Sequence, residues 1–247
     1  MLATERLSKH FGGVRAVHQV DLAVPANEIL GLIGPNGSGK STIVNLVTGV
    51  YAPTAGRVRF RDRDITGWPP HRVLATGIGR TFQNIRLFGN LTVWQNLWVV
   101  GRAGARRDRG RLGRWLRTDR ARLTQIEATL EFCGLRDRKE ELARSLAFGE
   151  QRRLELARIL AAEPDLLLLD EPAAGMNAAE IAELRDRIRL LKQRGKTIVL
   201  IEHHMELVMA VAERVVVLNF GEKIAEGPPA EVQESERVRE AYLGKRR

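Results

Sequence analysis

The stretch Gly34-Pro35-Asn36-Gly37-Ser38-Gly39-Lys40-Ser41 decides the fold of this chain. An apolar run at residues 29–33 precedes it, and a helix-like stretch at residues 42–47 follows it. Strand, glycine-rich loop and helix in this order are the context in which the pattern G-x-x-x-x-G-K-[ST] indicates a phosphate-binding loop. Small side chains let backbone N–H groups point at phosphate oxygens, and the helix adds the positive end of its dipole. We therefore expect an α/β fold that binds a nucleotide.

The last residues of this stretch carry the most specific expectations. Lys40 is expected to reach the β- and γ-phosphates, and Ser41 to offer its hydroxyl to Mg²⁺. Thr42, the next residue, completes the expected nucleotide-binding set. The alternative is a glycine-rich turn with a chance lysine, and the complete pattern argues against it.

Composition limits the possible partners and compartments. The 247 residues carry a net charge of +10, which calls for an acidic partner: nucleic acid, anionic lipid or a negative protein face. Cys133 is the only cysteine, so no intrachain disulfide is possible and a reducing cytosol is expected. The N-terminus shows no signal-peptide pattern. No apolar run approaches the roughly 18 residues of a membrane span.

Residues 2–24 alternate between apolar and polar side chains and are interrupted at Gly12-Gly13. Residues 56–60 show the same alternation, so both segments predict strands of a small antiparallel sheet. Phe11 lies next to the interruption, where its ring could stack on an adenine. A core phenylalanine is an equal alternative from position alone.

The segment at residues 77–84 predicts a strand that ends in a polar turn containing Gln83. A neutral glutamine can contact Mg²⁺ or an attacking water, although a surface glutamine is the commoner case. Thr92 and Gln95 predict a capping box that opens a helix carrying Trp94 and Trp98. Those rings are expected to pack inside their lobe, and a second interpretation has Phe88 and Trp98 line a groove for a partner helix.

Nine arginines and four glycines lie close together at residues 101–122. The composition predicts a flexible basic insertion at residues 102–122. A solvated loop, a contact with anionic lipid headgroups and a contact with nucleic acid all fit it. Phe and Tyr do not alternate with these arginines, which weakens the nucleic-acid alternative.

A short segment, Leu146-Ala147-Phe148-Gly149-Glu150, leads into a helix whose N-terminus is open to an anion. On its own this is a weak signal, because most helix N-termini contact only water.

Two apolar runs end in side chains suited to phosphate chemistry. Four leucines at residues 166–169 predict a strand buried on both faces, and Asp170 and Glu171 follow it. Asp170 is expected in the Mg²⁺ shell, and Glu171 is expected to polarise the water that attacks the γ-phosphate. A buried strand that ends in a capping acid is the alternative. Residues 197–201 predict another buried strand that delivers His203, although the adjacent His204 leaves the choice of ring open.

Together these motifs resemble, in order and spacing, the ATP-binding subunits of ABC transporters. The resemblance spans essentially the whole chain. It is strongest to the ATPases of branched-chain amino acid importers, in the motifs at residues 81–84, 146–155 and 170–177, in the basic insertion and in the ending at residues 241–244.

The resemblance implies a P-loop NTPase (RecA-like) core with a small antiparallel β subdomain and an inserted α-helical subdomain. It implies one ABC ATPase domain at residues 1–247: a core at 1–87 and 163–226, a helical subdomain at 88–162 and a helical tail at 227–247. Phe11 matches the aromatic residue that stacks on adenine.

The resemblance also implies partners. Two ATPase subunits would pair head to tail and hold each ATP between residues 34–41 of one and 146–150 of the other. Two transmembrane permease subunits would contact the region of Gln83 and Phe88, and a periplasmic solute-binding protein would act indirectly. The expected location is the cytoplasmic face of the inner membrane, peripherally bound.

Two departures from the family pattern stand out. Ala147, Phe148 and Glu150 replace the Ser, Gly and Gln of the usual signature, and Asn177 replaces a common Asp. The branched-chain group shares the signature variation, and its systems pair two different ATPases. The alternatives are another ABC transporter ATPase (urea import or lipopolysaccharide export), a soluble nucleic-acid-associated ABC ATPase and a structural nucleotide switch.

Overall fold

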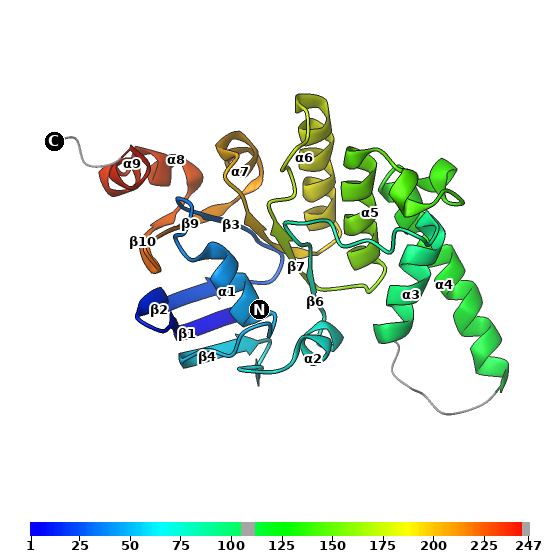
Figure 1. Ribbon diagram of the computed structural model, residues 1–247, viewed down its shortest axis with the longest axis horizontal. Helices are drawn as coiled ribbons and strands as arrows, with labels where there is room; N and C mark the ends of the chain where they lie inside the picture. The colour runs from blue at the N-terminus through cyan, green and yellow to red at the C-terminus, as the bar shows by residue number, and fades with distance from the viewer. Residues whose placement is uncertain (105–111, 244–247) are drawn as a thin grey trace. The chain divides into compact units, whose positions relative to one another are not determined.

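The structure is a computed structural model that describes residues 1–104 and 112–243. The chain forms two compact units, unit 1 (Met1–Arg80 and Asp165–Arg247) and unit 2 (Thr81–Pro164). Each unit has its own hydrophobic core. Figure 1 labels the elements of both.

Unit 1 contains a six-stranded sheet in the order β10-β9-β3-β8-β7-β6. Its strands are β3 (Ile29–Ile33), β6 (Ile78–Arg80), β7 (Leu166–Asp170), β8 (Thr197–Ile201), β9 (Arg214–Asn219) and β10 (Glu222–Gly227). Neighbours run parallel except the antiparallel pair β9 and β10. Every residue of β3, β7 and β8 is buried, which confirms the buried strands predicted from their apolar runs.

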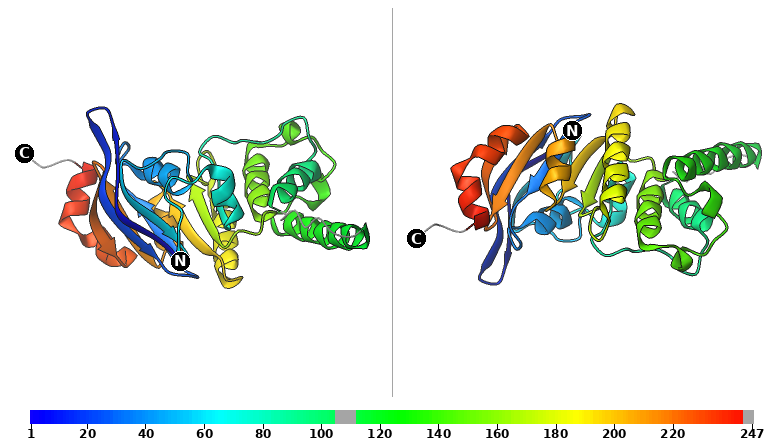
Figure 2. Two further views of the ribbon diagram at one scale, coloured as in Figure 1. Left: turned by 90° about the horizontal axis from the view of Figure 1, so that it is seen from below. Right: turned by 90° about the horizontal axis from the view of Figure 1, so that it is seen from above.

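A second sheet in unit 1 is antiparallel, with the order β2-β1-β4-β5. It consists of β1 (Leu2–Phe11), β2 (Val14–Val24), β4 (Ala55–Phe60) and β5 (Arg63–Asp64). Gly12, at a φ of 56°, turns the chain between β1 and β2. The predicted small antiparallel sheet is confirmed, and its β1–β2 hairpin is visible in both views of Figure 2.

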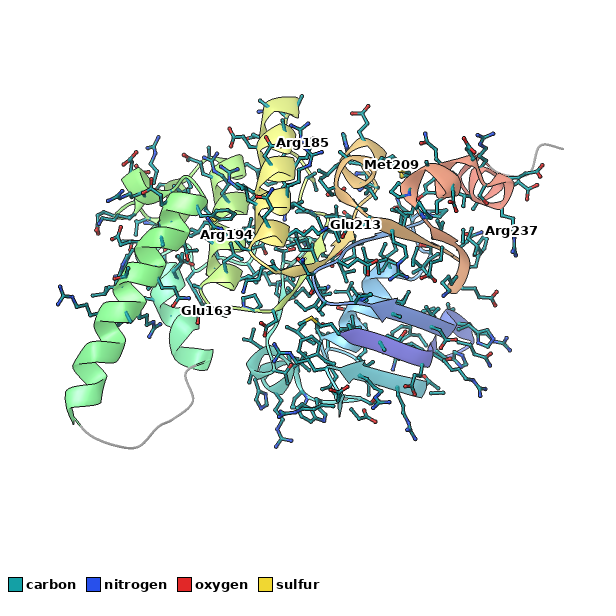
Figure 3. All side chains as sticks on the ribbon, turned by 180° about the vertical axis from the view of Figure 1, so that it is seen from behind. Glu163, Arg185, Arg194, Met209, Glu213 and Arg237 are labelled. Atoms are coloured by element: carbon teal, nitrogen blue, oxygen red, sulfur yellow. The ribbon has the colours of Figure 1, made fainter. Side chains whose placement is uncertain are left out.

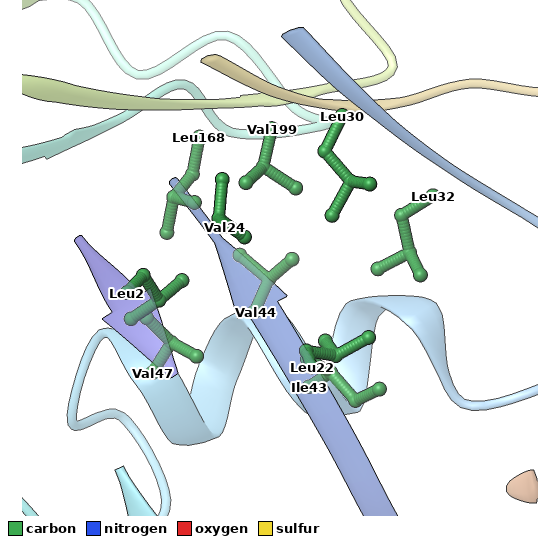
Figure 4. Close-up of a pocket in the computed structure, with 10 residues that line it drawn as sticks. All are labelled: Leu2, Leu22, Val24, Leu30, Leu32, Ile43, Val44, Val47, Leu168 and Val199. Atoms are coloured by element: carbon green, nitrogen blue, oxygen red, sulfur yellow. The ribbon is translucent and has the colours of Figure 1, made fainter. Parts of the chain in front are cut away.

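Helix α1 (Lys40–Val47) follows the glycine-rich loop and packs between the two sheets. Its apolar side chains Ile43, Val44 and Val47 face Leu2, Leu22 and Val24 of the small sheet and Leu30, Leu32, Leu168 and Val199 of the large one (Figure 4). These ten side chains leave a cavity of only about 10 Å³. The loop before α1 is therefore anchored by a helix with almost no room to shift.

The remaining helices of unit 1 are α2 (Pro70–Ala75), α6 (Ala178–Gln193), α7 (Met205–Val211), α8 (Pro229–Glu234) and α9 (Glu236–Leu243). The last two lie in the segment for which the helical tail is predicted. Asn177 caps α6, because its side chain accepts from the Glu180 N–H at 3.0 Å while the Glu180 carboxylate accepts from the Asn177 N–H at 2.9 Å.

Unit 2 is helical: α3 (Val93–Gly104), α4 (Leu112–Phe132), η1 (Arg136–Arg138), η2 (Ala143–Ser145) and α5 (Phe148–Leu160). The predicted capping box is present, with Thr92 N–H to Gln95 Oε1 at 2.9 Å and Gln95 N–H to Thr92 Oγ1 at 3.2 Å. Trp94 and Trp98 stack with ring centroids 5.0 Å apart beside the unit's core. No helix in the described part of the chain is both long and apolar enough to cross a bilayer.

The expected flexible insertion at residues 102–122 is wrong at both of its described ends. Helix α3 continues through Gly104, and α4 already begins at Leu112. Arginine, leucine and alanine are good helix formers, and their summed propensity outweighs the interspersed glycines. Residues 105–111, the middle of this segment, lie outside the described residues.

Candidate functional site

The parallel strands of unit 1 bring three predicted motifs to one edge of the sheet. Strand β8 lies between β3 and β7, and its Ile201 pairs with Leu32 on one side and Asp170 on the other. The phosphate loop after β3, Glu171 after β7 and His203 after β8 therefore emerge side by side. Ligands bind at this carboxyl edge in open α/β sheets.

The phosphate loop needs glycine for two different reasons. A Cβ on Gly34 would lie 2.2 Å from the Leu218 carbonyl oxygen, and one on Gly39 would lie 2.5 Å from the Ala16 carbonyl oxygen. At Gly37 nothing lies within 4 Å, but its φ of 78° is strained for other residues. Backbone conformation favours glycine at all three positions, and at Gly34 and Gly39 a close main-chain carbonyl excludes a Cβ as well.

Lys40 connects this loop to the carboxylates that follow β7. Its Nζ donates to the carbonyl oxygens of Gly34 at 2.7 Å and Pro35 at 3.0 Å. Burial lowers the pKa of Lys40, and the negative charges of Glu171 and Asp170 partly oppose that shift. The ammonium group and both carboxylates thus share one electrostatic environment.

Ser38 offers an observation that bears on ligand fit. Its hydroxyl is buried, yet it has no hydrogen-bond partner among the described residues. Buried hydroxyls are normally paired, and a phosphate oxygen would accept this hydrogen. The loop is therefore chemically suited to an anion.

Asp170 and Glu171 have very different surroundings. Asp170 is 2% exposed, and its Oδ2 accepts from Arg80 Nη2 at 2.8 Å. Glu171 has a φ of 48°, which is unusual for a residue with a side chain, and its N–H donates to the Ile201 carbonyl at 2.8 Å. Such strain is found where the surrounding structure fixes a functional residue.

The structure distinguishes the two neighbouring histidines. The His203 side chain is 61% exposed at the edge that carries the phosphate loop, whereas Nδ1 of His204 is buried. His203 can therefore meet a ligand without rearrangement. Its catalytic role stays a prediction.

Gln83 and residues 146–150, called the signature motif below, belong to unit 2. Arg152 holds the main chain around Gln83, with Nη2 at 2.7 Å from the Gln83 carbonyl and Nη1 at 3.1 Å from the Phe82 carbonyl. Glu155 Oε1 accepts from the Phe82 N–H at 3.2 Å. Burial raises the pKa of Glu155, with the Phe82 N–H and the charge of Arg152 opposing the shift. Sequence analysis missed both residues, although their i, i+3 spacing on the signature helix was a usable signal.

The signature motif starts α5. Ala147 is the N-cap and cannot cap with its side chain, but Glu150 Oε2 accepts from the Ala147 N–H at 3.0 Å. Gly149 is buried, Phe148 is 48% exposed, and the Leu146 carbonyl accepts from Gln151 Nε2 at 2.9 Å. Helix α5 begins at Phe148, one residue before Gly149, so its N-terminal N–H groups lie within residues 146–150.

Phe11 lies at the tip of β1 and is 43% exposed, which does not fit the core alternative. Its ring meets Tyr51 edge to face at 5.3 Å, and the Lys9 ammonium lies 5.1 Å from the Phe11 centroid. Sequence analysis missed Tyr51 and Lys9. An exposed, supported ring is suited to stacking on a base, and that role stays a prediction.

The oxygen groups of unit 1 fit Mg²⁺ as it binds beside phosphates. Mg²⁺ usually takes one or two protein oxygens, phosphate oxygens and waters. Ser41 supplies a hydroxyl and Asp170 a carboxylate. Ser41 directly follows Lys40 in the chain, and the charge of Asp170 acts on the Lys40 ammonium. The described residues contain no cluster of three or more His, Cys, Asp or Glu side chains that could hold a metal. Such a cluster is not needed when phosphate supplies the remaining oxygens.

Known proteins resemble this chain over almost its full length. A family model described as ABC transporter matches residues 17–174, and one described as branched-chain amino acid ATP-binding cassette transporter matches residues 222–247. LivG of Salmonella typhimurium, a high-affinity branched-chain amino acid transport ATP-binding protein, is 42% identical, covering 99% of this chain and 98% of LivG. LptB of Escherichia coli, a lipopolysaccharide export ATP-binding protein, is 36% identical over 98% and 97%. An ATP-binding cassette of an ABC transporter, solved in its ADP conformation, aligns with a TM-score of 0.86 at 30% identity over 99% of both chains.

Proposed function

The chain belongs to the ABC transporter ATP-binding family and is an ATPase, and from this premise we propose that it powers the import of branched-chain amino acids. The supporting observation is the match of residues 222–247 to the branched-chain family model, together with 42% identity to LivG over 99% of the chain. The C-terminal match is the most specific sign because all ABC ATPases share the phosphate loop.

Within the site, the residues act on ATP in distinct ways. Lys40 exchanges the loop carbonyls for the β- and γ-phosphate oxygens, while the Ser38 hydroxyl gains the acceptor that it lacks. Glu171 orients and polarises the attacking water, and His203 contacts the γ-phosphate. Ser41 and Asp170 would hold Mg²⁺, which neutralises charge on the phosphates when bound. Phe11 stacks on the adenine.

A second ATPase subunit completes each nucleotide-binding site. Residues 146–150 of one subunit, at the start of α5, cover the ATP held by residues 34–41 of the other. Closure of the pair on two ATP molecules, and reopening after hydrolysis, moves two membrane subunits between outward and inward access. The region of Gln83 and Phe88 receives a membrane-subunit helix, since the Phe88 ring is 47% exposed. In this proposal the protein acts from the cytoplasmic face of the membrane.

The test is reconstitution with the neighbouring membrane subunits, the second ATPase and the solute-binding protein in proteoliposomes. Uptake of labelled leucine, isoleucine and valine is expected with MgATP and not with a non-hydrolysable analogue. Urea should not be transported.

Lipopolysaccharide export is a second candidate because LptB is 36% identical over the same length. ATP-dependent release of lipopolysaccharide from the same vesicles, without amino acid uptake, would replace the first proposal with the second. A nucleic-acid function would instead show as ATPase stimulation by RNA or DNA.

A further inference from the structure

A fully buried carboxylate lies between the two catalytic strand ends of unit 1. Glu202 directly follows β8 and is 0% exposed. Its Oε1 accepts from the Ala173 N–H at 2.8 Å, and its Oε2 accepts from the N–H groups of His203 at 3.1 Å and His204 at 3.2 Å. One side chain therefore joins the segment after β7 to the segment after β8.

The chemistry of this contact requires a carboxylate. Three backbone donors converge on the two oxygens, and a carboxylate only accepts hydrogen bonds. A glutamine of the same shape would turn its NH₂ group toward at least one backbone N–H. Burial of a charge is costly unless hydrogen bonds compensate for it, so an apolar residue would suffice if only packing mattered.

The two residues with proposed catalytic roles lie beside this bridge. Glu171, at its strained φ of 48°, precedes Ala173 by two positions, and its N–H is held by Ile201, the residue before Glu202. His203 is itself one of the donors to Glu202. Two hydrogen bonds therefore hold the backbone around Glu171. The Ile201 carbonyl accepts from the Glu171 N–H, and the Glu202 carboxylate accepts from the Ala173 N–H.

We propose that Glu202 is a positioning residue that fixes Glu171 and His203 in one geometry for ATP hydrolysis. This inference rests on the proposed roles of those two residues. Glu202 accepts hydrogen bonds from backbone N–H groups, its Oε2 also lies 3.9 Å from Nδ1 of His203, and it acts through Glu171 and His203. Losing the bridge frees both strand ends while Lys40 and the phosphate loop stay in place.

The experiment compares Glu202→Gln with Glu213→Gln in the full chain, supplied with its partner ATPase. Glu213 is a matched control because its carboxylate also accepts a backbone N–H, that of Ile29 at 3.2 Å, at the opposite end of the sheet (labelled in Figure 3). We expect kcat of Glu202→Gln to fall about tenfold or more, as for loss of hydrogen bonds to a charged group. Fluorescent ATP-analogue affinity should stay within about twofold, because the phosphate loop is unchanged.

Two further readouts separate positioning from general stability. Amide exchange in Glu202→Gln should accelerate at Ala173, His203 and His204 but not within β7 or β8. In a Glu171→Gln background, Glu202→Gln should change the residual rate far less than it does in the wild type, because the two residues act as a unit. Equal rate losses in both backgrounds, or wild-type kcat with accelerated exchange, would overturn the proposal.

A variant that fails to fold still leaves the proposal testable in the wild-type protein. The amides of Ala173, His203 and His204 should then resist exchange although they lie outside the helices and strands, and rapid exchange there would refute the bridge. The outcome is separable from the proposed function. Full turnover by Glu171→Gln alone would remove the catalytic role, while the exchange data would still report on Glu202.

Discussion

Arg80 and Asp170 form an ion pair in the interior of unit 1, with Nη2 and Oδ2 2.8 Å apart and side chains only 10% and 3% exposed. Arg80 Nη1 also donates to Asn45 Oδ1 at 2.6 Å. One guanidinium group thus connects β6, α1 and the carboxyl end of β7. Asp170, which is expected in the Mg²⁺ shell, is therefore oriented by Arg80 from the edge strand β6.

Replacing Arg80 with methionine should destabilise the protein by about 3 kcal/mol or more, because Asp170 would keep a buried charge without its main partner. Urea unfolding measures this loss. Arg61→Met is the matched control, since Arg61 pairs with Asp165 at the surface of the same unit, where an ion pair is worth at most about 1 kcal/mol. Equal losses in the two variants would show that burial of the Arg80 pair has no special importance.

Lys40→Ala should weaken ATP binding roughly a hundredfold, the effect of losing charged hydrogen bonds to phosphate. Fluorescence titration with an ATP analogue measures the affinity. Lys192→Ala removes a lysine that pairs with Glu213 and should bind normally. Undiminished affinity in Lys40→Ala would refute the phosphate-loop assignment.

Glu171→Gln should bind ATP normally but hydrolyse it about a hundredfold more slowly, because an amide cannot accept the proton of the attacking water. Phosphate release and ATP-dependent pairing of subunits are the two measurements. Glu163→Gln is the control, since Glu163 also has a positive φ, 51°, and is exposed (Figure 3). Near-normal turnover by Glu171→Gln would assign the general base elsewhere.

Ala147→Ser should stabilise the signature helix by about 1 kcal/mol, because serine at this N-cap would complete the capping box that Glu150 half forms. Thermal unfolding measures the gain, and Thr92→Ala, which removes the hydroxyl half of the existing box on α3, should show a loss of similar size. The new hydroxyl should also favour ATP-dependent pairing of subunits. A destabilised Ala147→Ser protein would contradict the N-cap geometry.

Glu213 predicts an acid dependence of stability. The hydrogen bond from Lys192, with that from the Ile29 N–H, lowers the pKa of Glu213 from its ordinary value of 4.5. A lowered folded-state pKa means that the unfolded chain takes up the proton first, so this stability is complete above pH 4.5 and is lost as the pH falls through the folded-state value. Urea unfolding of Glu213→Gln should therefore depend less on pH below that point. An unchanged acid limb would contradict the contact.

Local sequence patterns predicted the core of the molecule well. The buried strands β7 and β8, the strand and helix on either side of residues 34–39 and the capping box of Thr92 depend on neighbours in sequence, and all were confirmed. Arg80, Glu155 and Glu202 were missed, because a charged residue reveals its burial only through partners distant in the chain. The prediction of a loop in the arginine-rich segment was wrong at its described ends. The glycines and charges indicated a loop, but the helix propensity of the other residues outweighed them.

The atoms that a Cβ on Gly34 or Gly39 would meet first are the main-chain carbonyl oxygens of Leu218 and Ala16. A second mutation can replace a clashing side chain by a smaller one. It cannot remove a main-chain carbonyl, because every amino acid carries one. Suppressor screens should therefore recover no local revertants of Gly34→Ala or Gly39→Ala, whereas Gly37→Asn, which meets open space, should remain open to genetic rescue.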